Sequence, residues 1–308
     1  MKDQSKEMPA SLRLLLTDLI DYAGLFPPAA LEMAPAVRNY AGYLASENAW
    51  MLGRFIVPMA RLDEFEQSAS ELLPRGNPVY PWRLSALGSA DLAADLNRIG
   101  EFNHLHARDE TAGAVVVDSI ELKAEKADDV YRAMRLLPRT MLAYFEIPIT
   151  RDPQALTDVI AETGALAKVR TGGVTEQAFP TTDDLARFIS ACVSARVAFK
   201  ATAGLHHPLR ASYRLTYEPD STSAVMHGFL NVFLAAAFAR FGAGTEEITH
   251  LLEETSPAAF RFDEEGVTWG TRRLNQQKLL VARQSFAIAY GSCSFEEPID
   301  DLKRIGLL

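Results

Sequence analysis

Short apolar segments recur along the chain at a spacing of about 25 to 35 residues, and this rhythm restricts the fold more than any other feature. Segments of strand character cover residues 54–58, 79–87, 114–121, 141–149, 165–171 and 197–203. Helix-patterned segments lie between them, at residues 62–73, 90–103, 126–137, 153–163 and 182–195. This alternation predicts βα units, and strands that are apolar almost throughout indicate a parallel sheet buried on both faces.

Two weaker segments complete a set of eight strands, with residues 19–26 as the first strand and residues 286–290 as the last. We therefore predict an α/β fold, a single (β/α)8 TIM-like barrel domain over residues 1–308. A doubly wound open sheet is the alternative, because strand rhythm does not show closure.

The stretch between the last two strands, residues 208–285, is predicted to be a long insertion within the barrel. It contains an amphipathic helix, a second helix and a hairpin, at residues 226–241, 245–254 and 260–269, and the hairpin turns at 264–266. An insertion on the active-site face of a barrel serves as a lid or as a surface for a homo-oligomer.

Composition narrows the range of partners. The formal net charge is −9, which argues against a nucleic-acid surface because phosphate binding needs a basic face. The apolar stretch 229–241 is shorter than the roughly 20 residues that span a bilayer. Residues 1–7 are polar and do not resemble a signal peptide. Only two cysteines occur, Cys192 in an apolar helical run and Cys293 as a candidate for exposure, which suggests a reduced compartment. We expect a cytoplasmic protein with no nucleic-acid or membrane partner.

Two lysine-bearing segments form the strongest functional signal. Lys168 and Arg170 lie near the end of one strand segment, and Lys200, His206 and His207 lie near the end of the next. Strand ends and the loops after them form the active-site face of a parallel barrel. Cations that cluster at one end of a barrel repel one another, which destabilises the fold unless an anionic ligand or a catalytic role compensates for it. We therefore predict a small anionic substrate.

Three short patterns in these regions are Lys-x-x-Thr-Gly at 168–172, Lys-Ala-x-x-Gly at 200–204 and Gly-Ser-x-Ser at 291–294. Together they resemble strands six to eight of the deoxyribose-phosphate aldolase family of class I aldolases. The resemblance implies aldolase or lyase chemistry, with Lys168 as the Schiff-base lysine and Lys200 as the neighbour that lowers its pKa. It implies a phosphate cradle made of Gly172, Gly173, Gly204, Ser292 and Ser294. The chain departs from the family pattern at Arg170, at His206-His207 and at Phe295, which replaces a glycine.

The residues themselves support part of this assignment. A lysine attacks a carbonyl only when neutral, and desolvation or a second cation favours the neutral form. Glu146 or Asp118 is predicted to be the acid/base. The predicted anion-binding side chains are Arg83, Arg170, Thr171, Thr202, His206 and His207. In the alternative interpretation, Lys168 and Lys200 only pair with Asp118, Glu121 or Glu146 inside the barrel, and Arg83 pairs with Glu121.

Two further hypotheses remain open. His206 and His207 with Glu146 offer imidazole and carboxylate ligands for a divalent metal, which predicts a metal-dependent lyase or isomerase; the Schiff-base hypothesis needs no cofactor. The barrel is alternatively a non-catalytic ligand-binding or assembly module, with residues 229–241 as an interface. Near the first strand, Asp21 either reaches the pocket or belongs to a tightly packed turn.

Overall fold

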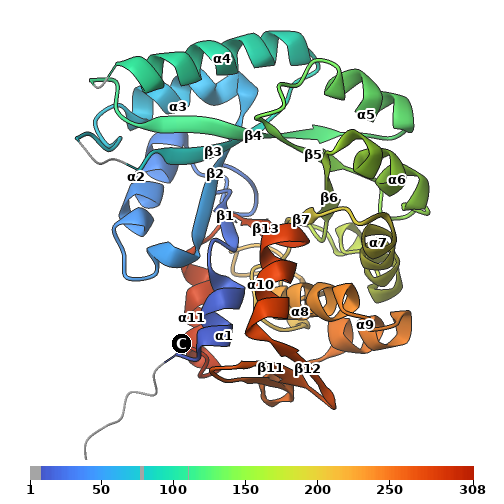
Figure 1. The fold of residues 1–308 in the computed structure, drawn as a ribbon. Helices are drawn as coiled ribbons and strands as arrows, with labels where there is room; N and C mark the ends of the chain where they lie inside the picture. The colour runs from blue at the N-terminus through green and yellow to red at the C-terminus, as the bar shows by residue number, and fades with distance from the viewer. Residues whose placement is uncertain (1–7, 77–79, 110) are drawn as a thin grey trace, which may run out of the picture.

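The computed structural model describes residues 8–76, 80–109 and 111–308, and in it eight parallel strands close into a barrel (Figure 1). The strands are β1 (Ile20–Tyr22), β2 (Leu52–Pro58), β3 (Trp82–Leu87), β4 (Val115–Lys123), β5 (Leu142–Glu146), β6 (Leu166–Arg170), β7 (Phe199–Thr202) and β13 (Ala287–Ser292). β1 pairs with both β2 and β13, which closes the ring. The predicted (β/α)8 barrel is confirmed, and the open doubly wound sheet is excluded.

Strand positions follow the prediction, while some of their ends differ. β1 is only three residues long where residues 19–26 are predicted, and β13 runs two residues beyond the predicted end at 290. Residue 79, at the predicted start of the third strand, lies outside the described residues, as do residues 1–7.

Helices surround the barrel. They are α1 (Ala10–Leu16), α2 (Met33–Leu44), α3 (Leu62–Ala69), α4 (Leu92–Arg108), α5 (Ala127–Met134), α6 (Gln154–Thr163), α7 (Thr182–Ala195) and α11 (Glu296–Arg304). α1 precedes the first strand, and each of the other helices in this set follows a strand. Local capping explains several starts: the Asp91 side chain accepts the Ala94 N–H at α4, and the Thr181 side chain accepts the Asp184 N–H at α7. These bonds satisfy backbone donors that have no partner inside the helix.

The insertion between β7 and β13 has three parts. A two-stranded sheet, β8 (Ala211–Arg214) and β9 (Ser223–Met226), comes first, followed by α8 (Phe229–Arg240) and α9 (Thr245–Glu253). A three-stranded sheet of β10 (Phe260–Phe262), β11 (Gly266–Trp269) and β12 (Arg272–Asn275) then leads into α10 (Gln276–Ser285). The β10–β11 hairpin agrees with the prediction, and β12 is a third strand that the sequence pattern did not indicate.

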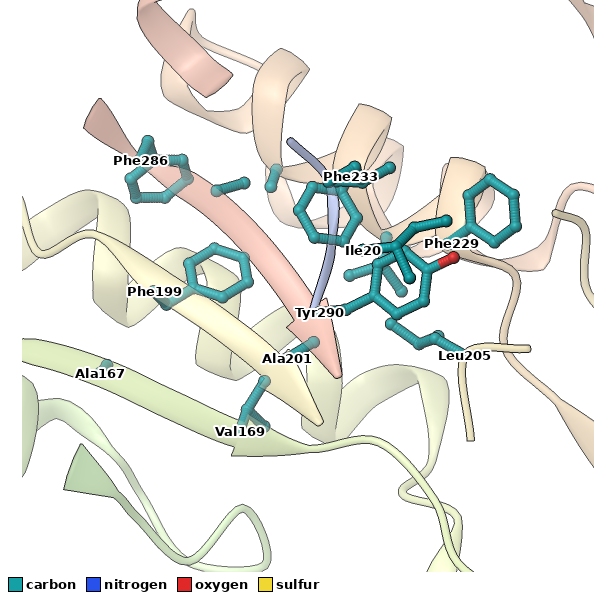
Figure 2. Packing of buried hydrophobic residues seen from close by; sticks show 14 of the residues in the cluster. Ile20, Ala167, Val169, Phe199, Ala201, Leu205, Phe229, Phe233, Phe286 and Tyr290 are labelled. Atoms are coloured by element: carbon teal, nitrogen blue, oxygen red, sulfur yellow. The ribbon is translucent and has the colours of Figure 1, made fainter. Parts of the chain in front are cut away.

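α8 differs from the predicted amphipathic helix because it is buried on all sides. Every residue from Phe229 to Ala239 is buried, and α7, α9, α10 and β13 pack around the helix. Figure 2 shows Phe229 and Phe233 next to Tyr290 of β13, with ring centroids 5.4 and 5.9 Å from that of Tyr290. The hypothesis that this segment is an interface between copies is therefore wrong: its apolar surface forms core within one chain. No helix among the described residues combines the length and the apolar character needed to cross a bilayer.

Candidate active site

Three charged side chains occupy facing positions on neighbouring strands. Glu146 of β5 is the register partner of Lys168 of β6, which is in turn the partner of Lys200 of β7. Register partners in a parallel sheet point to the same face. The flanking Ala167, Val169, Phe199 and Ala201 point the other way, into the hydrophobic core (Figure 2). The three charged groups therefore point into the barrel.

Glu121 of β4 connects the two lysines. Its Oε2 lies 2.7 Å from the Lys168 Nζ and its Oε1 lies 2.7 Å from the Lys200 Nζ. Ser85 of β3 donates a hydrogen bond to the same Oε1 at 2.7 Å. Because β4 and β7 are not neighbours in the barrel, the contact with Lys200 crosses its interior.

Each lysine also has a carboxylate partner of its own. The Lys168 Nζ lies 2.8 Å from the Glu146 Oε2, and the Lys200 Nζ lies 2.5 Å from the Asp21 Oδ2. The Tyr144 ring centroid lies 5.2 Å from the Lys200 Nζ, within the range of a cation–π contact. Asp21 thus reaches the barrel interior, which agrees with the interpretation that it points toward the pocket and not with that of a tightly packed turn.

Asp118 belongs to a different part of the network. The Nε and Nη2 of Arg54 donate to its two carboxylate oxygens at 2.5 and 2.8 Å. The Arg54 backbone N–H also donates to Asp21 Oδ1 at 2.7 Å. Asp118 therefore pairs with Arg54 instead of with either lysine, and the carboxylate between the lysines is Glu121.

The interior of this barrel is consequently charged where most such barrels pack branched aliphatic side chains. Four cations (Arg54, Lys168, Arg170 and Lys200) pair with four carboxylates (Asp21, Asp118, Glu121 and Glu146). Burial alone would raise carboxyl pKa values, but the charges of Lys168 and Lys200 outweigh it and hold the pKa of Glu121 well below its usual range. Burial disfavours the Lys200 ammonium, yet Asp21 and Glu121 raise its pKa. The network is thus electrically balanced.

A cavity of about 240 Å³ opens above this network at the carboxyl ends of the strands. Lys168, Glu121, Arg170, His206 and Cys293 contribute to its lining. The remaining lining residues are Ala23, Phe26, Pro27, Ile56, Leu87, Gly173, Val174, Thr202, Ala203 and Gly291. The Lys200 side chain is 1% exposed and is not part of this lining, so only one of the two amines faces the cavity.

Two further hollows adjoin the cavity. A groove of about 780 Å³ shares Leu87, Glu121, Lys168 and Arg170 with it and runs along the ends of β3, β4 and β5. A second cavity of about 250 Å³ shares Gly173 and His206 and is covered by the β8–β9 segment. The shared residues make the ion network accessible from outside the barrel.

The predicted anion-binding residues divide into two groups. Arg170, Gly173, Thr202 and His206 line the main cavity, and Gly204 and His207 line the adjoining one. Thr171 is fully buried and donates to the carbonyl oxygens of Thr202 and Ala203. The other residues that do not line either cavity are Arg83, Gly172, Ser292 and Ser294.

Arg83 and the two serines have local partners. Arg83 lies near the amino end of β3 and pairs with Asp18 at 3.2 Å, so it contacts neither Glu121 nor the cavities at the carboxyl ends of the strands. Ser292 donates to the Ser294 carbonyl at 2.6 Å, and the Ser294 Oγ accepts the Glu297 N–H at 3.1 Å. The serine pair therefore stabilises the turn into α11.

Gly172 and Gly204 are required for close packing of the loops after β6 and β7. A Cβ on Gly204 would lie 2.7 Å from the Gly172 Cα and 3.0 Å from the Thr171 carbonyl oxygen, and φ of Gly204 is +74°. We expect Gly204→Ala to lower the free energy of unfolding by at least about 2 kcal/mol, through left-handed strain and steric overlap.

Urea unfolding of the full chain measures this effect, and Gly100→Ala is the matched control. A Cβ on Gly100, within α4, meets nothing within 4 Å. That substitution is expected to raise the free energy of unfolding by about 0.5–1 kcal/mol, because alanine loses less backbone entropy in a helix. If Gly204→Ala and Gly100→Ala changed the free energy of unfolding equally, the close packing of the loops after β6 and β7 would not contribute to stability.

The metal-ligand set His206, His207 and Glu146 does not converge. Both Glu146 oxygens are engaged, by Lys168 and by Arg170, whose Nε lies 3.3 Å away. The two histidines point instead to α11, where the His206 Nδ1 is 3.1 Å from Glu297 and the His207 Nδ1 is 2.5 Å from Asp301. Within the described residues no group of three or more such side chains is arranged to hold a metal ion.

Sequence reasoning did not assign site roles to Arg54, Ser85, Tyr144 or Cys293. Arg54 and Ser85 are polar residues inside otherwise apolar strand segments, and that interruption is the signal that could have identified them. Cys293 is 5% exposed and lines the cavity, so it is buried instead of lying at the surface.

Comparison of the chain with protein-family models, curated proteins and solved structures gives no match. The fold alone is compatible with many enzymes. Function is therefore inferred from the side chains of the site.

Proposed function

We propose that the protein is an enzyme that acts on a small anionic carbonyl compound and forms or cleaves a carbon–carbon bond through a Schiff base on Lys168. The observation that carries the proposal is the different position of the two lysines. Lys168 lines the cavity, whereas Lys200 lies below it, 1% exposed and held by Asp21 and Glu121. One amine can meet a substrate, and the other acts through its charge.

Lys168 must lose a proton before it attacks a carbonyl carbon. Its Nζ contacts two carboxylates, those of Glu121 and Glu146, and it shares Glu121 with Lys200. Glu146 is the base that takes the proton, because its side chain is 15% exposed and borders the groove. Burial opposes ionisation of Glu146, but the charges of Lys168 and Arg170 outweigh it and lower its pKa.

The covalent sequence uses one nucleophile and one proton carrier. The neutral Lys168 nitrogen bonds to the carbonyl carbon, and the π electron pair moves to the oxygen, which accepts the proton from Glu146. A second proton from the nitrogen passes through Glu146 to the hydroxyl, water leaves, and the nitrogen keeps its third proton, which gives a protonated imine (iminium).

The bond that then breaks joins the α carbon, which is attached to the iminium carbon, to the β carbon, which carries a hydroxyl group. A carboxylate removes the proton of the β-hydroxyl group, that oxygen becomes an aldehyde, and the electron pair of the broken bond moves toward the iminium nitrogen. Protonation of the resulting enamine and addition of water release the second product and restore Lys168. Arg170 lines the cavity and is 51% exposed, and in this proposal its guanidinium binds the anionic group of the substrate.

Borohydride trapping with a panel of small aldehydes and keto acids tests the proposal, with intact mass and peptide mapping as the readout. We expect a reduced adduct on Lys168 that is absent from Lys168→Arg, which keeps the positive charge between Glu121 and Glu146. Lys123→Arg is the matched control, because Lys123 is exposed and borders the same groove. An adduct on other lysines only, or none across the panel, would reject the Schiff-base assignment.

A further inference from the structure

A second reactive group borders the same cavity as Lys168. Cys293 follows β13 and is 5% exposed, and it lines the cavity together with His206 of the loop after β7. The mechanism above uses neither side chain as a nucleophile. An amine and a thiol therefore meet at one cavity.

The thiol belongs to a compact cluster of titratable groups. The Cys293 Sγ lies 3.9 Å from the His206 Nδ1, which is also 3.1 Å from the Glu297 Oε2. The hydroxyl of Tyr217 lies 3.7 Å from the Sγ and donates to the same Glu297 oxygen at 3.2 Å. Glu297 thus orients both the imidazole and the phenol against the sulfur.

Electrostatics within this cluster favour an imidazolium–thiolate pair. Burial disfavours charge on His206, but its contacts with Cys293 and Glu297 outweigh burial and raise its pKa to about 10. Burial raises the pKa of the Cys293 thiol, and the contact with His206 outweighs it, with smaller lowering effects of Tyr217 and the Ala29 backbone. Tyr22 of β1 is a further titratable group whose charge couples to Cys293.

We propose that Cys293 is a second nucleophile of the cavity and that it adds reversibly to small aldehydes. In this step the sulfur bonds to the aldehyde carbon, and the π electron pair moves to the oxygen. The oxygen accepts the proton from the His206 imidazolium, which gives a neutral hemithioacetal. The inference rests on the proposed function for the source of the aldehyde, which carbon–carbon cleavage releases beside Cys293.

An aldehyde is the electrophile whose addition needs only the Cys293 thiolate and the His206 imidazolium. Addition needs one nucleophile and one proton donor, and it needs neither a leaving group nor an oxidant. The only other cysteine, Cys192, is fully buried in α7, so the chain supplies no accessible second thiol for disulfide exchange. A volume of about 240 Å³ holds about eight water-sized groups, which suits a small molecule.

Alkylation of the full chain by iodoacetamide at pH 7 tests the reactivity of the thiol, with peptide mass spectrometry as the readout and Cys192 as the internal control. We expect Cys293 to react at least about tenfold faster than Cys192, because a thiolate is the reactive form and burial raises the pKa of Cys192. His206→Asn is expected to slow alkylation of Cys293 by about tenfold, since an ordinary thiol is only a few per cent thiolate at this pH. Equal rates for the two cysteines would overturn the proposal.

Acetaldehyde protection then tests the adduct. We expect acetaldehyde to slow alkylation of Cys293 in the unmodified chain and in Lys168→Arg, and the rate to recover after dialysis; Lys168→Met serves as a second variant. Protection that disappears in both lysine variants would assign the aldehyde to Lys168 and overturn the role of Cys293, while supporting the proposed function. Protection of Cys293 without any borohydride adduct on Lys168 would support the thiol and reject the Schiff base.

Discussion

Glu121→Ala is expected to lower the free energy of unfolding by about 3–5 kcal/mol, because it leaves two buried ammonium groups without their shared carboxylate. The Glu121 side chain is 1% exposed and contacts Lys168, Lys200 and Ser85. Its removal leaves each lysine with one carboxylate and takes away the negative charge that lies between the two ammonium groups. Urea unfolding measured at pH 7 gives the change directly.

Two variants separate the charge from the packing. Glu121→Gln keeps the size of the side chain and an acceptor for Ser85, so we expect most of the loss to remain if charge dominates. Glu125→Gln is the surface control: the ion pair of Glu125 with Arg151 is 3.6 Å long, and both side chains are largely exposed. We expect a change of less than about 1 kcal/mol there. A loss for Glu121→Gln as small as that for Glu125→Gln would contradict the view that a balanced charge network stabilises the interior.

Glu121 and Glu146 determine how the free energy of unfolding changes with pH on the acid side. The pKa values of Glu121 and Glu146 are lowered in the folded protein by the charges that overcome burial. Their stabilisation is therefore present above the ordinary glutamate pKa of about 4.3 and is lost as the pH falls further. The acid-side decrease in unfolding free energy should be shallower in Glu121→Gln than in the unmodified chain.

The strand rhythm predicted the βα units because strands buried on both faces are mostly apolar, but it did not show that the sheet closes, and the open doubly wound sheet stayed an alternative. It was less informative where tertiary packing overrides local pattern. We expected a helix with one apolar side over residues 226–241, but every residue from Phe229 to Ala239 except Asn231 is apolar, and α7, α9 and α10 pack around α8. β1 is short, and its neighbours in sequence continue into loops instead of strand.

The identity of the carboxylate beside the lysines was the least predictable part of the site. Asp118 and Glu121 are three positions apart, so strict alternation along a strand would place them on opposite faces. The register of β3 and β4 shifts between Leu84 and Ser85, where Leu84 pairs with Val117 and Ser85 with Ser119. This irregularity lets both carboxylates enter the barrel at different depths, Asp118 toward Arg54 and Glu121 toward the lysines. A single sequence does not reveal such a bulge.

The second large effect is expected for Lys200→Met, which should lower the free energy of unfolding by about 3–5 kcal/mol. The Lys200 Nζ is the cation between Asp21 and Glu121, and its side chain is 1% exposed. Without it, two buried carboxylates face one another across a methionine. Because the pKa of Lys200 is raised by these partners, its contribution is fully present below the ordinary lysine pKa of about 10.4, so the loss should be nearly constant between pH 6 and 9.

The double variant Lys200→Met with Asp21→Asn tests whether charge balance is the cause. Asparagine keeps the Oδ1 that accepts the Arg54 N–H at 2.7 Å, and it removes one of the two opposing negative charges. We expect the double variant to be more stable than Lys200→Met alone by about 1–3 kcal/mol, and a double-mutant cycle that includes Asp21→Asn alone gives the coupling energy of the two groups. Lys303→Met, at an exposed position of α11, is the control for loss of a lysine without burial. If the effects of Lys200→Met and Asp21→Asn simply add, the two groups act independently, and the charge of Asp21 is not what the Lys200 ammonium balances.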